Sequence, residues 1–282
     1  MRMKNSTRRK LTTAIRVAIL TFFAVLVIAP IYWMVATSLK THREIVDAHV
    51  VSYWPRLFTM ENYEALFAQL NYGSFLRNSI LVSVATALIV TVFSVLGGYS
   101  LARYKFVGKG SIMLFLLMTQ MIPGILVMIP TYLLFTHMGL TNTHLSLLIF
   151  YVVVNAPFCA ITMRSFFERI PVALEEASWV DGCTRLSGLL RIVLPVMFPG
   201  IVAVFVFAFI GAWNELIAGT IFLNTPDMWT IPVGLKSLIG KYDVRWGALM
   251  AGGVLALLPT AVMFVFVQRF VVEGLTAGGV KE

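Results

Sequence analysis

Long stretches of apolar residues alternate with shorter polar segments along the chain. Six of these stretches are long enough to cross a membrane, and they run at about 17–38, 79–102, 111–136, 144–164, 197–222 and 247–271. A helix crosses the hydrocarbon core with roughly 20 residues at a rise of about 1.5 Å per residue. Because a lipid-exposed backbone must satisfy its own hydrogen bonds, the pattern predicts an all-α integral membrane protein with six transmembrane helices.

One polar segment, residues 165–196, differs sharply from the apolar stretches on both sides of it. It holds three acidic residues within seven positions, Glu175, Glu176 and Asp181, followed directly by Gly182. Acidic side chains are costly to place in lipid. We therefore expect this segment to lie in water, as a loop that contacts another molecule.

The composition agrees with a membrane protein. The chain has 282 residues, of which 59% are hydrophobic and 12% charged, whereas soluble domains carry about 25% charged residues. A formal net charge of +9 would suggest a nucleic-acid partner in a soluble protein. Here the basic residues lie in short loops rather than in a run interleaved with aromatic residues, so we expect no nucleic-acid partner.

The positions of lysine and arginine indicate the orientation. If the N-terminus is cytoplasmic, 15 basic residues fall in the inside segments and 7 in the outside segments. The positive-inside rule then places both termini, and segment 165–196, in the cytoplasm. The predicted parts are a cytoplasmic N-terminal segment 1–16, a six-helix domain 17–271 and a cytoplasmic tail 272–282.

Proline residues in the third, fourth and sixth predicted spans are informative. Each removes a backbone hydrogen bond and tends to kink its helix. Kinked helices suit a protein that surrounds a pathway, and Pro157 is of interest because Asn155 precedes it. The alternative is that membrane helices simply tolerate proline. The prolines concerned are Pro123, Pro130, Pro157 and Pro259.

The polar segment is itself predicted to form two helices joined by a turn. Pro171 is placed as the first residue of one helix, and Gly182 permits the left-handed turn that ends it. Thr184 can cap a second helix that ends near Pro195. Small residues before the turn leave room for another surface to approach. The alternative is a plain solvated loop.

The spacing within this segment resembles the EAA loop of binding-protein-dependent ABC importers. That pattern reads Glu-Ala-Ala, three residues, Gly, nine residues, then Ile, any residue, Leu and Pro. At matching spacing the chain has Glu176-Ala177-Ser178, Gly182 and Ile192-Val193-Leu194-Pro195. Ser178 is the one departure, and it keeps the small size.

Three other stretches resemble the carbohydrate branch of this family, and in particular the second membrane subunit of the maltose transporter. They are Trp213-Asn214-Glu215, the run from Trp229 to Gly234 and the run from Gln268 to Lys281. The resemblance covers essentially the whole chain. It implies the type I permease fold of ABC importers, in a bacterial or archaeal cytoplasmic membrane, with a di- or oligosaccharide as the solute. Permeases for glycerol phosphate or polyols look much the same in this subunit.

The resemblance also implies partners. A second permease subunit would complete a heterodimer, and a homodimeric cytoplasmic ATPase would bind the ATP and Mg. An extracytoplasmic binding protein would deliver the solute. The chain itself is expected to bind no cofactor and to catalyse no reaction.

Two elements of the chain are implied to contact the ATPase. In this family the EAA loop docks in a groove of the ATPase, and a similar C-terminal tail reaches the interface between its two subunits. The alternative for the tail is a frayed terminus. The coupling residues so implied are Glu176, Ala177, Ser178, Asp181, Gly182, Leu194 and Pro195, and the tail residues are Thr276, Ala277, Gly278 and Gly279.

A third element lies in the fifth apolar stretch. Glu215 is about 15 residues from the predicted cytoplasmic end of that helix, roughly 22 Å along it, and an acid at that depth must face protein or water. One interpretation is that Trp213, Asn214 and Glu215, with Asn155, line the solute pathway, because amides and indoles suit sugars. The other is an interhelical clamp made by Glu215.

Other functional classes find little support. There is no GxxxxGK[ST] phosphate loop, no GxSxG and no HExxH, so a partner must hydrolyse the ATP. His137 and His144 have no acid or cysteine at ligand spacing, and no metal site is expected. The predicted spans hold no Asp and one Glu, which argues against a membrane-embedded enzyme. Neither an inverted repeat nor several buried charges indicate a channel or secondary transporter.

Overall fold

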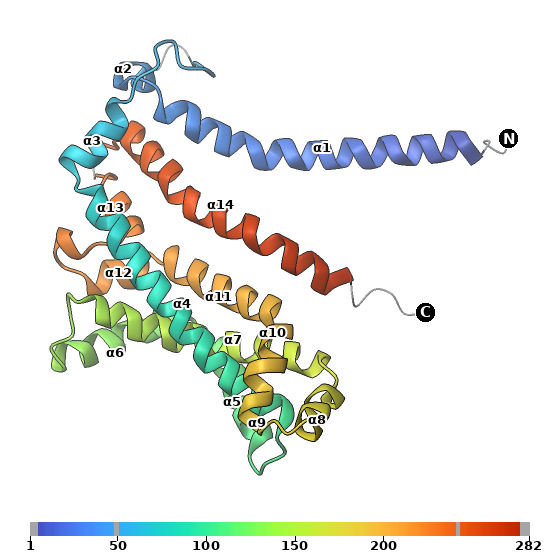
Figure 1. Cartoon of the computed structure of the whole chain (residues 1–282). Coiled ribbons are helices and arrows are strands. Elements are labelled where there is room, and N and C mark those ends of the chain that lie inside the picture. The colour runs from blue at the N-terminus through green and yellow to red at the C-terminus, as the bar shows by residue number, and fades with distance from the viewer. Residues whose placement is uncertain (1–4, 48–50, 241–242, 277–282) are drawn as a thin grey trace. The chain divides into compact units, whose positions relative to one another are not determined.

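The computed structural model describes residues 5–47, 51–240 and 243–276, with side chains between residues 9 and 268. In these ranges all regular elements are helical, apart from one isolated β-bridge between Ile239 and Val244 (Figure 1). The predicted all-α class is therefore confirmed. The chain divides into two compact units, Met1–Leu70 with Ser237–Ala256, and Asn71–Lys236 with Leu257–Glu282.

The first unit is built from α1 (Asn5–Ser38), α2 (His42–Val46), α3 (Glu61–Gln69) and the first turns of α14 (Trp246–Thr276). A buried amide ties α3 to the end of α1. Asn62 Nδ2 donates to the carbonyl oxygens of Ser38 at 2.9 Å and of Lys40 at 2.8 Å. The apolar side chains of α1 are largely exposed within the chain, as expected for a helix surrounded by lipid or by another subunit.

The second unit is organised around α4 (Tyr72–Arg103), which packs along α7 (His144–Arg169) and against α11 (Phe198–Trp213) (Figure 1). Asn78 Nδ2 donates to the carbonyl oxygens of Asp227 and Trp229, and so holds the chain after α11 against α4. The remaining elements of this region are α8 (Val172–Val180), α9 (Arg185–Gly188), the π-helical η1 (Leu189–Val193), α10 (Leu194–Val196), α12 (Ile217–Phe222), the 3-10 turn η2 (Pro226–Met228) and α13 (Ile231–Lys236).

The third apolar stretch forms two helices instead of one. α5 (Lys109–Met121) and α6 (Gly124–His137) meet at an angle of 95°. Pro123 explains the break, because it has no amide hydrogen and it holds the preceding Ile122 in an extended conformation with ψ of 119°. The single continuous helix expected at 111–136 is thus corrected to a bent pair of helices.

The fifth apolar stretch, expected as one helix over 197–222, is also divided. α11 ends at Trp213, and α12 begins at Ile217. The Glu215 carboxylate stabilises this second helix start, because it accepts hydrogen bonds from the first amides of α12. An acid expected within a continuous span, near its outer end, instead lies in an interruption between two helices.

The described chain contains four to six candidate spans. Four unbroken helices are long and apolar enough to cross a membrane, over Arg9–Ser38, Tyr72–Arg103, His144–Arg169 and Trp246–Gln268. Two bent pairs bring the number to six if each counts as one span. These are α5 with α6, and the segment Arg185–Val196 with α11, which meet at 77°.

Candidate functional site

The polar segment 165–196 forms a helical hairpin, as expected. α8 and the helical segment that starts with α9 are joined by a short turn. The Thr184 side-chain oxygen accepts a hydrogen bond from the amide of Ser187 at 3.2 Å, and so caps α9 as predicted. Pro171, expected as the first helical residue, instead occupies the N-cap, one position before α8 begins at Val172.

The turn of the hairpin has the hydrogen bonds of a Schellman motif. The amide of Cys183 donates to the carbonyl of Ser178 at 2.9 Å, and the amide of Gly182 donates to the carbonyl of Trp179 at 3.1 Å. Gly182 has φ of +87°, a left-handed conformation that side chains with a Cβ disfavour. A Cβ added there would meet no atom within 4 Å. Glycine is therefore favoured at this position by the backbone conformation and not by a lack of space.

The second arm of the hairpin, from α9 to α10, changes from α-helical to π-helical hydrogen bonding before it ends. In η1 the amide of Leu194 donates to the carbonyl of Leu189, five residues earlier. Pro195 has no amide hydrogen to continue the normal ladder, which accounts for a π-turn at this point. The arm ends at Val196, near the expected Pro195, and α11 then departs at 77°.

A buried ion pair fixes the first arm to the rest of the unit. Arg103 Nε lies 2.6 Å from Glu175 Oε1, and the Tyr99 hydroxyl donates to Glu175 Oε2 at 3.0 Å. Arg103 Nη2 also donates to the carbonyl of Ile170 at 2.9 Å, at the end of α7. Arg103 and Tyr99 lie one turn apart on α4. The Glu175 carboxylate thereby holds α8 to α4, and Arg103 links this contact to the end of α7.

Sequence reasoning missed this role of Glu175. It treated the two adjacent acids together, although neighbouring residues on a helix point about 100° apart. The sequence did contain a signal for it. Tyr99 and Arg103 are four residues apart at the end of an apolar helix, so two polar side chains lie on the same face of that helix. The ion pair therefore separates Glu175, which faces inward, from Glu176, which is exposed.

One side of α8 is left open. Ala173, Glu176, Ala177 and Val180 are all exposed at spacings of three and four residues, and we call them the outer face of α8. Val180 is 87% exposed. A small-residue stripe with one acid and one protruding valine is suited to close contact with a complementary groove.

Ser178 does not belong to this outer face, contrary to expectation. It is buried, its hydroxyl donates to the carbonyl of Glu175 at 2.7 Å, and a Cβ added at Gly188 would lie 2.6 Å from the Ser178 Oγ. The small size at position 178 therefore serves the packing of α8 on α9. Among the other expected coupling residues, Asp181, Gly182 and Pro195 are exposed and Leu194 is half-buried.

Glu215 makes its contacts within the chain. Its Oε2 accepts from the Tyr151 hydroxyl at 3.0 Å and from the amide of Ala218 at 2.9 Å, while Oε1 accepts from the amide of Ile217 at 2.9 Å. The amide of Gly219 also donates to Oε2, at 3.3 Å. This carboxylate joins α7 to the start of α12, which is the geometry of an interhelical clamp.

The other expected pathway residues do not converge on an open site. Trp213 is buried and stacks on Phe209 with ring centroids 5.4 Å apart. Asn155 Nδ2 donates to the carbonyl of Tyr151 at 2.8 Å, and a Cβ added at Gly211 would lie 2.6 Å from Asn155 Oδ1. Asn155 therefore packs between α7 and α11, close to the clamp, whereas Asn214 is exposed. Within this chain Asn155, Trp213 and Glu215 therefore support helix packing more directly than a sugar site.

The C-terminal residues can be placed only in part. Thr276 is the last residue of α14, while Ala277, Gly278 and Gly279 lie outside the described residues. Within the described part of the chain no three His, Cys, Asp or Glu side chains gather as metal ligands would.

Comparison with known proteins gives consistent matches. Residues 94–276 match the family model described as "Binding-protein-dependent transport system inner membrane component". The chain is 34% identical over 264 residues to the inner membrane ABC transporter permease protein YcjP of Escherichia coli, which covers 93% of this chain and 94% of that protein. It is 29% identical over 261 residues to the trehalose/maltose transport system permease protein MalG of Thermococcus litoralis, which covers 92% and 93% respectively.

A solved structure gives the same answer for the fold. A chain of a bacterial ABC transporter involved in the import of the acidic polysaccharide alginate aligns with a TM-score of 0.81, over 95% of this chain and 99% of that chain. The sequence identity is 21%, so this likeness concerns the fold alone.

Proposed function

The chain belongs to the family of binding-protein-dependent transport system inner membrane components, and on this premise we propose that it forms half of the translocation pathway of an ABC importer for a di- or oligosaccharide. The family assignment confirms the resemblance drawn from the EAA spacing. Members of such a family are permeases without catalytic activity, and ATP and Mg are bound by the ATPase partner.

The observation that carries the coupling role is the two-sided character of α8. Its inner side is fixed to α4 through Glu175, whose partner Arg103 also bonds the end of α7, and its outer face presents Glu176, Ala177 and Val180 to a partner. A helix held in this way moves with the helices behind it. Docking of the outer face in a groove of the ATPase would therefore pass rigid-body motion to the permease, and Glu176 is placed to pair with a basic residue there.

The proposed topology has six spans with both termini in the cytoplasm of a bacterium or archaeon. Each bent pair then counts as one span. This arrangement is supported by the bias of 15 against 7 basic residues and places the hairpin at the cytoplasmic face. The proposed parts remain the segment 1–16, the permease domain 17–271 with its loop 165–196, and the tail 272–282.

The proposed assembly contains a second permease subunit, a homodimeric ATPase and an extracytoplasmic binding protein. None of the apolar side chains of α5 is buried within the described residues. This exposure supports the proposal that a further subunit or lipid surrounds the chain. The tail residues Thr276, Ala277, Gly278 and Gly279 are proposed to contact the ATPase dimer.

The proposed solute is a sugar because MalG of T. litoralis, at 29% identity over nearly the full length, is named for trehalose and maltose. The alginate transporter that shares the fold is likewise named for a saccharide. Within the chain, no contact among the described residues identifies one sugar over another, which is consistent with selection by the binding protein.

Reconstitution of the complete importer tests this function. The chain would be co-expressed with the ATPase and the second permease, purified as a complex and placed in liposomes with the binding protein outside. We expect uptake of a radiolabelled di- or oligosaccharide only when ATP is supplied on the ATPase side. Liposomes that lack this subunit are the control. Uptake without ATP, or transport of glycerol phosphate or a polyol but no saccharide, would contradict the proposal.

A further inference from the structure

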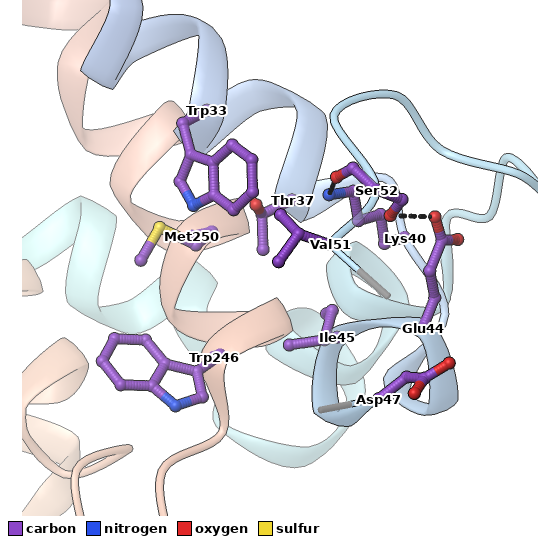
Figure 2. A pocket seen from close by; sticks show the side chains of 10 residues that line it. All are labelled: Trp33, Thr37, Lys40, Glu44, Ile45, Asp47, Val51, Ser52, Trp246 and Met250. Carbon is purple, nitrogen blue, oxygen red and sulfur yellow. Dashed lines mark hydrogen bonds between the residues drawn. The ribbon is translucent and has the colours of Figure 1, made fainter. Parts of the chain in front are cut away.

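A pocket of about 340 Å³ lies in the first unit, at the end of α1 that precedes α2 (Figure 2). Residues from the end of α1, from α2, from positions 51 and 52, and from the start of α14 line it. This volume falls in the range of small-molecule sites, which are about 300–1,000 Å³. The pocket is separate from the hairpin and from the Glu215 clamp.

Two indoles form one side of the pocket. Trp33 and Trp246 are 39% and 48% exposed, and Figure 2 shows Met250 between them. Ile45 and Val51 approach from the opposite side. An indole offers a flat apolar face with a polar edge, and such a face suits the C–H surface of a pyranose ring better than it suits a compact ion.

A buried hydroxyl between these groups has no partner. Thr37 is 6% exposed and lines the pocket, and among the described residues no group accepts from or donates to its Oγ1. An unsatisfied buried hydroxyl costs about 1–3 kcal/mol, so native proteins rarely leave one without water or a ligand. The hydroxyl is therefore free to bond a polar group that enters the pocket.

Charged groups complete the polar side. Lys40 is buried; its Nζ donates to the Ser52 carbonyl and lies 4.5 Å from the centre of the Trp33 ring. The Ser52 hydroxyl donates to Glu44 Oε1 at 2.6 Å. Burial raises the pKa of Glu44, but hydrogen bonds from Ser52 and the Arg56 amide, with the charges of Lys40 and Arg56, outweigh burial and lower it. A cationic donor and an ionised acceptor thus flank the indoles.

We propose that this pocket binds a sugar ring of the solute outside the membrane, an inference that rests on the proposed function. Trp33 and Trp246 would pack against the ring, and Thr37, Lys40 and Glu44 would hydrogen-bond its hydroxyls. A quaternary ammonium ligand fits less well, because Lys40 already lies over Trp33. In the proposed orientation the pocket opens on the extracytoplasmic side, where the binding protein releases the sugar.

The test uses the complete importer in lipid nanodiscs without the binding protein. Saturation-transfer NMR would measure binding of maltose, trehalose and a panel of other neutral disaccharides. Thr37→Val removes the hydroxyl at constant shape and should weaken binding roughly two- to tenfold. Trp246→Leu removes an indole and should weaken it by at least about fivefold.

Matched variants serve as controls. Thr37→Ser keeps the hydroxyl, and Trp54→Leu removes an exposed indole of the same unit that does not line the pocket. Both should bind within about twofold of the wild type, and size-exclusion chromatography should show all four complexes intact. Equal binding by all variants, or no binding of any saccharide by the wild type, would overturn the inference.

Two further outcomes separate this inference from the proposed function. If Thr37→Val and Trp246→Leu leave binding and the KM for uptake unchanged while saccharide uptake proceeds, only the pocket assignment fails. If the complete importer transports no saccharide, the proposed function fails.

Discussion

Arg103 and Glu175 lie 2.6 Å apart, between Nε and Oε1, and their side chains are only 10% and 4% exposed. The two residues are 72 positions apart in the sequence. Burial removes most of the solvent screening that weakens surface ion pairs. This ion pair therefore attaches the hairpin to α4. Removal of either residue would leave the other as a buried charge without its partner.

We expect Glu175→Ala to destabilise the protein by about 3 kcal/mol, because Arg103 would keep a buried charge. The variant should show a lower thermal midpoint in detergent and reduced uptake. Glu176→Ala is the matched control, since Glu176 is exposed; it should keep the thermal midpoint and lose only coupling to the ATPase. The double variant Arg103→Met with Glu175→Met should be more stable than Glu175→Ala. Equal midpoints for Glu175→Ala and wild type would show that the ion pair contributes no stability.

Replacement of Gly182 should disturb the hairpin through its backbone alone. Gly182 has φ of +87°, and no atom lies near an added Cβ. Gly182→Ala should therefore destabilise the turn by about 1–2 kcal/mol through backbone strain. The variant should still reach the membrane but show lower transport-coupled ATPase activity. Gly182→Asn should be milder, because asparagine tolerates this conformation. Gly73→Ala is the control, because Gly73 also has open space but no positive φ. Normal coupled activity in Gly182→Asp or Gly182→Ala would argue against the coupling role.

Glu215→Gln should weaken the clamp between α7 and α12. The carboxylate accepts from Tyr151 and from three amides, and loss of its charge should cost about 1–3 kcal/mol. Uptake should fall by the same factor for every saccharide tested, because a clamp does not select among them. Tyr151→Phe should give a smaller loss in the same direction. A change in the order of preferred sugars would instead favour a role in lining the pathway.

Deletion of residues 275–282 should lower transport-coupled ATPase activity if the tail contacts the ATPase dimer. Assembly of the complex should be unaffected, because the described part of α14 is retained almost entirely. The measurement is ATP hydrolysis with and without solute-loaded binding protein. Unchanged stimulation in the truncated protein would favour a frayed terminus without a role.

The sequence predicted where helices lie better than where they end. Apolar runs located the long helices, because burial in lipid needs continuous apolar residues. Gly182 and Thr184 marked the hairpin turn, because turn geometry depends on local backbone preferences. Pro123 indicated a kink, yet the 95° bend between α5 and α6 also depends on packing that composition does not reveal.

The candidate site was predictable only in outline. Glu175 and Glu176 are chemically identical, so only the three-dimensional position of Arg103 decides which of them is anchored. Ser178 was read as part of a docking surface, and its burial against Gly188 follows from the packing of two arms whose orientation the sequence does not specify. Glu215 was read as part of a continuous helix because Ile217–Phe222 prolongs the apolar run, although Asn214 and Glu215 together could have indicated a break.

The 77° angle between the second arm of the hairpin and α11 determines how a displacement changes direction. A push along the axis of the segment Arg185–Val196 has only a minor component along α11, and most of it acts across that helix. α11 would therefore tilt about its far end instead of sliding along its length. If the ATPase displaces the hairpin as proposed, the hairpin and α11 would convert an axial displacement of one helix into a tilt of the next.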